Sequence, residues 1–215
     1  MNNVVKLFSI NKDFRIAVVD TSILAKEQLK DFRGTDVIRC FLEKIIVNFT
    51  LLSAIDDNNT KISINIHLNN NMSVFCQISN NLFEMFYSDS LNEFNGKVSD
   101  LFSEKTSLSI TKGDWNTGLH TGSVDAYIDS ADMLFSHFTF QSDQLPSNFI
   151  SLQNRGVLVQ PLPFCDEHNF AVANREVAYL LRALENSDWL NVDFIYRDIA
   201  VKISESQISN LPIYY

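Results

Sequence analysis

The stretch that decides the fold, residues 119–164, contains the strings Ser142-Asp143-Gln144-Leu145-Pro146 and Gly156-Val157-Leu158-Val159-Gln160-Pro161-Leu162-Pro163. Its pattern predicts a strand, a helix, a turn, a strand, a tight turn and a strand, in that order. Asp129 is expected to cap the helix, since a side-chain oxygen there accepts a free backbone N–H. Helical spacing then predicts a buried apolar stripe of Ala131, Leu134, Phe135 and Phe138.

Pro146 should stop this helix, because proline cannot continue the helical hydrogen-bond pattern. A hairpin is predicted next, with strands over 149–152 and 157–160. The turn between them is predicted to be Gln153-Asn154-Arg155-Gly156.

The residues before this stretch predict a strand over 15–20 and a short helix over 22–30. Thr35 is expected to open a long helix over 36–55. This helix should be largely buried, because its apolar stripe is wide. The stripe consists of Val37, Ile38, Phe41, Leu42, Ile45, Ile46, Phe49 and Leu52.

Strict alternation of apolar and polar residues predicts a β-hairpin with strands over 61–68 and 72–79. Its turn is Asn69-Asn70-Asn71, since asparagine tolerates the left-handed conformation. Further strands are expected at 82–87, 108–111 and 118–124. The predicted fold class is therefore α+β: a mostly antiparallel sheet domain with a long buried helix over residues 1–165, and a small helical linker segment over 166–215.

The composition favours a large core and argues against charged partners. Of the 215 residues, 46% are hydrophobic and 17 are phenylalanine, and the net charge is −9. No basic run is present, so neither nucleic acid nor an anionic membrane is an expected partner. Residues 1–10 do not resemble a signal peptide, and no apolar run reaches the roughly 20 residues that span a bilayer. Three separated cysteines suit a reducing compartment, so we expect a soluble cytoplasmic protein.

The sequence contains no recognisable catalytic or metal-binding motif. Cys165 and His168 have the spacing of half a zinc site, but no second pair exists and a polar loop is the simpler interpretation. Cys40 and Cys76 are interpreted as small buried hydrophobic residues. No G-x-S-x-G string, glycine-rich phosphate loop or acid–base pair is apparent. We therefore predict no enzyme activity and no bound metal.

Residues 119–164 resemble the heat-shock protein 33 family, the redox-regulated holdase chaperones of bacterial cytoplasm. Gly122 and Val124 match before the helix, and 138–146 is similar to the family's aromatic followed by Ser-Glu-Gln-x-Pro. Residues 156–163 are similar to its Gly-Gly-x-Leu-x-Gln-x-x-Pro strand. Asp143 and Arg155 depart from the family's Glu and second Gly. The order of the upstream elements also fits, so the resemblance covers nearly the whole chain.

The resemblance implies a zinc switch that we expect this chain to lack. In the family, four cysteines in C-x-C and C-x-x-C motifs bind zinc, and their oxidation releases the metal and uncovers client-binding surface. The chain contains neither motif and stops at Pro212-Ile213-Tyr214-Tyr215. The expectation is a missing C-terminal zinc domain and no cofactor in this chain.

The resemblance implies an ATP-independent holdase chaperone, a homodimer that binds unfolding or misfolded proteins under stress and prevents their aggregation. The alternative is a dimeric protein-interaction module without general chaperone activity, and an enzyme with unrecognised chemistry is a third hypothesis. The candidate client-binding residues are apolar and lie in the linker; their alternative role is to pack on the sheet. They are Trp189, Leu190, Phe194, Ile195 and Tyr196.

Overall fold

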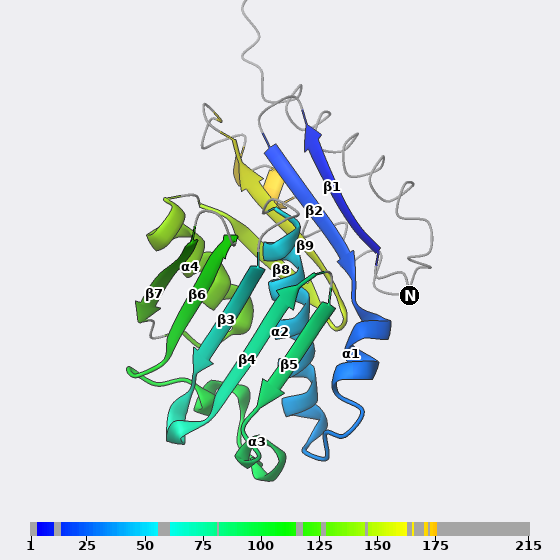
Figure 1. Ribbon diagram of the computed structural model, residues 1–215, viewed down its shortest axis with the longest axis vertical. Coiled ribbons are helices and arrows are strands. Elements are labelled where there is room, and N and C mark those ends of the chain that lie inside the picture. The colour runs from blue at the N-terminus through cyan, green and yellow to red at the C-terminus, as the bar shows by residue number, and fades with distance from the viewer. Residues whose placement is uncertain are drawn as a thin grey trace, which may run out of the picture.

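Two antiparallel β-sheets enclose a layer of helices in the computed structural model (Figure 1). The structure describes residues 4–10, 14–55, 61–80, 82–114, 118–125, 128–144, 146–162, 165, 170–171 and 173–175. This architecture confirms the predicted α+β class. The segment from 176 to 215 lies outside the described residues, and with it most of the predicted linker.

The first sheet has four strands in the order β1-β2-β9-β8. Their bounds are Val4–Ile10 for β1, Phe14–Asp20 for β2, Asn148–Leu152 for β8 and Arg155–Pro161 for β9. The hairpin of β8 and β9 confirms the prediction, although its turn is only Gln153-Asn154, because Arg155 and Gly156 already pair with β8. β1 was not predicted; it is held by antiparallel pairing along the whole of β2.

The second sheet has five strands in the order β5-β4-β3-β6-β7. They are β3 Lys61–His67, β4 Ser73–Ser79, β5 Leu82–Tyr87, β6 Ser107–Asp114 and β7 Gly118–Asp125. The alternation predicted for β3 is confirmed, since Ile62, Ile64 and Ile66 are buried. A 3-10 turn, η1 (Asn69–Asn71), joins β3 to β4. A short helix α3 (Ser90–Glu93) and the 3-10 turn η2 (Val98–Leu101) lead from β5 to β6.

The long helix α2 (Asp36–Ala54) lies between the sheets, packing on β2, β8 and β9 of one and β4 of the other. Thr35 caps it as predicted, since its Oγ1 accepts from the Ile38 N–H. Ile45, Ile46 and Phe49 are fully buried, and burying each such side chain stabilises the fold by about 1.5–3 kcal/mol. The short helix α1 (Ser22–Gln28) precedes α2, and α4 (Ala131–Asp143) packs beside α2 on β6, β7 and β8.

Three side chains of α2 and α4 differ from the sequence predictions. Val37 belongs to the predicted buried stripe but is 50% exposed. Cys40, interpreted as buried, is also exposed, whereas Cys76 is buried as predicted. Both exposed residues lie near the start of α2, where no element of the described part of the chain covers their side chains. The N-cap of α4 is Ser130 rather than Asp129, because the Ser130 Oγ accepts from the Met133 N–H.

The structure explains individual residues in the two strings that decide the fold. Gln144 ends α4 in the left-handed conformation, with φ of 54°. A Cβ added to Gly156 would lie 2.3 Å from Val47 Cγ1, so only glycine lets β9 approach α2 this closely. Gln160 is buried and satisfied, accepting from Arg15 Nε at 3.0 Å and donating to Ser147 Oγ at 2.8 Å.

An apolar groove as the candidate functional site

The client-binding residues predicted from the sequence do not enter the described structure. Trp189, Leu190, Phe194, Ile195 and Tyr196 all lie outside the described residues. The candidate site therefore has to be built from the exposed apolar surface of the described part. Of the seven large hydrophobic side chains exposed in the described part, two, Val37 and Met133, lie where the start of α2 meets η2 and the start of α4.

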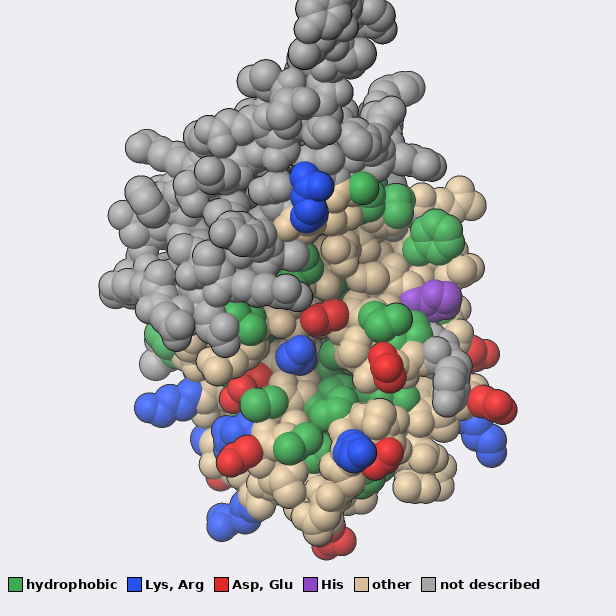
Figure 2. Space-filling model, turned by 180° about the vertical axis from the view of Figure 1, so that it is seen from behind, with side chains coloured by type: hydrophobic (Ala, Val, Ile, Leu, Met, Phe, Trp, Pro, Cys, Tyr) green, Lys and Arg blue, Asp and Glu red, His purple; other side chains and the backbone are tan. Residues whose placement is uncertain are grey.

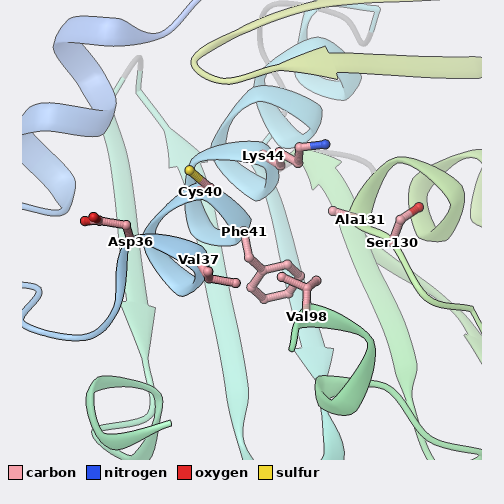
Figure 3. Close-up of a pocket in the computed structure, with 8 residues that line it drawn as sticks. All are labelled: Asp36, Val37, Cys40, Phe41, Lys44, Val98, Ser130 and Ala131. Carbon is pink, nitrogen blue, oxygen red and sulfur yellow. The ribbon is translucent and has the colours of Figure 1, made fainter. Parts of the chain in front are cut away.

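A hollow of about 460 Å³ opens between these three elements (Figure 3). Val37 and Phe41 extend from α2 toward Val98 of η2, while Ala131 closes the α4 side. The remaining lining residues are Asp36, Cys40, Lys44 and Ser130. The floor and walls are thus apolar, and charged groups stand at the border.

A second hollow of about 360 Å³ shares η2 and the start of α4. It is lined by Ser99, Phe102, Ile128, Asp129 and Met133. The rings of Phe41 and Phe102 meet edge to face at 5.9 Å and so join the walls of the two hollows. We call the two hollows together the apolar groove.

Both ends of the apolar groove present uncovered hydrophobic side chains. Val37 borders the first hollow and is 50% exposed, and Met133 borders the second and is 54% exposed. A hollow with exposed apolar side chains at its border is a candidate interaction surface. Methionine suits a site that must accept varied partners, because its thioether chain is flexible and polarizable.

Short local motifs place the elements of the groove. The backbone N–H of Lys97 donates to Asp100 Oδ2 at 2.9 Å and closes the η2 turn. Ser130 caps α4, and the aspartate two residues on anchors the start of that helix. Its carboxylate accepts from Asn48 Nδ2 of α2 at 2.7 Å and from Ser151 Oγ of β8 at 2.5 Å. Asp132 therefore fixes the distance between the two helices that form the groove.

The electrostatics of the groove suit binding rather than covalent chemistry. Burial raises the pKa of the Cys40 thiol, and the Glu43 and Asp36 carboxylates raise it further. The thiol is therefore a weak nucleophile near neutral pH, since the thiolate is the reactive form. Seen from behind, the molecule gathers hydrophobic side chains among acidic and basic ones (Figure 2).

The described residues do not fit the zinc that the family resemblance implies. A structural zinc site needs four ligands. Within the described part of the chain, no group of three or more His, Cys, Asp or Glu is placed to hold a metal ion. Burial in the sheet raises the pKa of the Cys76 thiol, which disfavours the thiolate that zinc requires.

The residues of this site come from three separated segments, so no local sequence pattern predicts it. The helical pattern places Phe41 in the buried stripe of α2, and Val98 belongs to no predicted element. One signal was present: the apolar stripe of α2 is too wide for its neighbours to cover completely.

In the described part of the chain, no helix is long and apolar enough to cross a membrane.

Comparison with known proteins places the fold and the family. No curated protein sequence matches the chain. Its structure is similar to that of the 33 kDa chaperonin (heat shock protein 33 homolog) of Thermotoga maritima, with a TM-score of 0.74 and 12% sequence identity. That match covers 94% of this chain and 75% of the Thermotoga chain. The family model described as Hsp33 protein matches residues 2–207, which is nearly the whole sequence, and the chain therefore belongs to the Hsp33 family of chaperones.

Proposed function

We propose that the protein is an ATP-independent holdase that binds unfolding proteins and prevents their aggregation. Membership of a chaperone family supports this function. The observation that carries it is the apolar groove, which is open at Val37 and Met133. An unfolding protein exposes apolar side chains, and the groove offers them a surface that excludes water.

The groove would hold such a segment weakly and reversibly. Burying one Val-, Leu- or Phe-sized side chain contributes about 1.5–3 kcal/mol. Ordering a flexible client segment opposes part of this gain. A few anchoring side chains therefore give an affinity suited to holding a client and releasing it, without nucleotide hydrolysis.

Further parts of this proposal come from the family resemblance. They are a homodimeric, cytoplasmic protein and the division at residue 165 into a core domain and a linker. A second client-binding surface is proposed in the linker. Its residues are Trp189, Leu190, Phe194, Ile195 and Tyr196.

The test is suppression of aggregation. The protein is mixed in equimolar amounts, without ATP, with several unrelated proteins that aggregate on heating, and light scattering is followed. We expect reduced scattering for most of them. Protection of none, or of a single client, would contradict a general holdase and favour a specific interaction module.

Two exposed side chains test the groove. The double variant Val37→Ser and Met133→Gln removes apolar surface without opening the core, so the fold should persist. We expect protection to fall several-fold. Leu119→Ser is the matched control, since Leu119 is 62% exposed on β7, away from the groove. Equal loss in both variants would remove the groove from the proposal.

A further inference from the structure

Two carboxylates in the apolar groove have no cationic partner in the described part of the chain. Asp36 lines the first hollow and Asp129 lines the second, and both are exposed. Lys44, the one cation that lines either hollow, lies 3.9 Å from the Asp132 carboxylate. The groove is therefore apolar along its floor and negative at its border.

The two carboxylates lie on either side of the aromatic centre. In the first hollow, Asp36 is at the opposite side from Ser130 (Figure 3). Asp129 immediately precedes Ser130 and borders the second hollow. Phe41 lines the first hollow and Phe102 the second, and the two rings are in edge-to-face contact. A segment lying along the groove would place its apolar part on these rings and its ends near the carboxylates.

We propose that the apolar groove selects polypeptide segments in which a short apolar stretch is flanked by lysine or arginine. This inference rests on the proposed function and names the client chemistry that the groove recognises. Long basic side chains suit such a position, since their stems pack on apolar surface while the charged head reaches the border.

Charge acts here on selection and on the rate of encounter. The net charge of −9 attracts cationic segments before contact, and the attraction is screened by salt. At the groove, an acidic residue beside the apolar stretch of a client would lie close to Asp36 or Asp129. Repulsion between the like charges would weaken the binding of that client. An exposed ion pair contributes about 0.2–1 kcal/mol, and two pairs of about 0.7 kcal/mol each give roughly tenfold discrimination.

The experiment uses three fluorescent peptides that share one apolar core and differ only in flanking residues: lysine, glutamine or glutamate. Fluorescence anisotropy measures their affinity for the full chain. We expect the lysine peptide to bind about tenfold more tightly than the glutamate peptide at low ionic strength, with the glutamine peptide between them. About 0.5 M salt should remove most of this difference.

Variants of the groove carboxylates test whether the preference for lysine-flanked peptides comes from the groove. In the double variant Asp36→Asn and Asp129→Asn, the ratio between the affinities of the lysine and glutamate peptides should fall below about threefold. Glu84→Gln is the matched control, because Glu84 is exposed on β5 and bonds to Gln77 rather than lining the groove. Thermal unfolding of each variant confirms that the fold is intact.

Each other outcome overturns the inference. Equal affinity for the three peptides, or a preference that survives the double variant, shows that these carboxylates do not select the client. Affinity that falls as protein concentration rises assigns the groove to a second copy of the chain. If client aggregation is suppressed but flanking charge has no effect, the holdase function stands and only this inference fails.

Discussion

Gln28 of α1 hydrogen-bonds through its side-chain amide to the backbone of Met85 in β5: its Oε1 accepts from the Met85 N–H at 3.0 Å. Its Nε2 donates to the Phe83 carbonyl at 3.3 Å. Among the described strands, β5 lies at the edge of its sheet, so these backbone groups have no neighbouring strand there. Gln28 takes the place of a strand residue and protects the edge from pairing with another chain.

Replacing Gln28 by alanine should therefore expose the β5 edge. We expect a loss of about 1–2 kcal/mol in the free energy of unfolding, because two partly buried backbone groups lose their partner. Urea denaturation measures it, and hydrogen exchange at the Met85 amide should become faster. Gln141→Ala, on the exposed surface of α4, is the control. An unchanged exchange rate at Met85 would contradict the protective role of Gln28.

Asp132→Ala should destabilise the contact between α2 and α4. The substitution leaves Asn48 Nδ2 and the Ser151 hydroxyl without their shared acceptor, and Asn48 is fully buried. We expect a loss of about 2–4 kcal/mol, measured by urea denaturation. Asp129→Asn changes an exposed carboxylate three residues away and should cost little. Equal stability of the two variants would show that the network does not hold α4.

Gly156→Ala should be destabilising through steric overlap. The new Cβ would lie 2.3 Å from Val47 Cγ1 and 3.1 Å from the Ile150 carbonyl oxygen. Overpacking of this kind costs about 1–3 kcal/mol. A double-mutant cycle with Val47→Ala provides the control, since removing the clashing methyl groups should restore part of the stability. If the stability losses of the two single variants simply add in the double variant, the steric overlap is not with Val47.

Cys76 should make stability fall with rising pH. Burial raises the pKa of its thiol above the ordinary value, so the folded protein keeps the proton that the unfolded chain releases. This contribution is fully present below the unfolded pKa of about 8.5 and is lost as the pH rises above it, at about 1.4 kcal/mol per pH unit. Urea denaturation between about pH 8 and 10 should show a shallower decline for Cys76→Ala than for the wild type. Identical slopes would exclude the contribution of Cys76.

The cysteines should also differ in their reaction with thiol reagents. Cys40 is exposed and should be alkylated in the native protein, though slowly near neutral pH because its pKa is raised. Cys76 is fully buried and should react only after unfolding. Mass spectrometry of digests after timed alkylation separates the sites. Native labelling of Cys76 at the rate of Cys40 would contradict the burial of that strand.

Local sequence patterns predicted most of the helices and strands, because interactions between residues close in sequence determine where these elements form. The alternation in 61–68 produced β3, and the Thr35 hydroxyl caps α2 where predicted. The N-cap of α4 differed by one residue, since Asp129 and Ser130 are both good caps and only backbone geometry selects Ser130. β1 was missed because its stability comes from pairing with β2.

By itself, the sequence determined the α+β class, the long buried helix, the two hairpins and the family resemblance, since periodicity and turn residues act over a few positions. Only the tertiary structure decided that Val37 and Cys40 are exposed and that Phe41, Val98 and Ala131 form one groove. An apolar stripe shows which face of a helix avoids water, but not how far its neighbours extend. That extent depends on the packing of α2 between two sheets, and the groove lies where this cover ends.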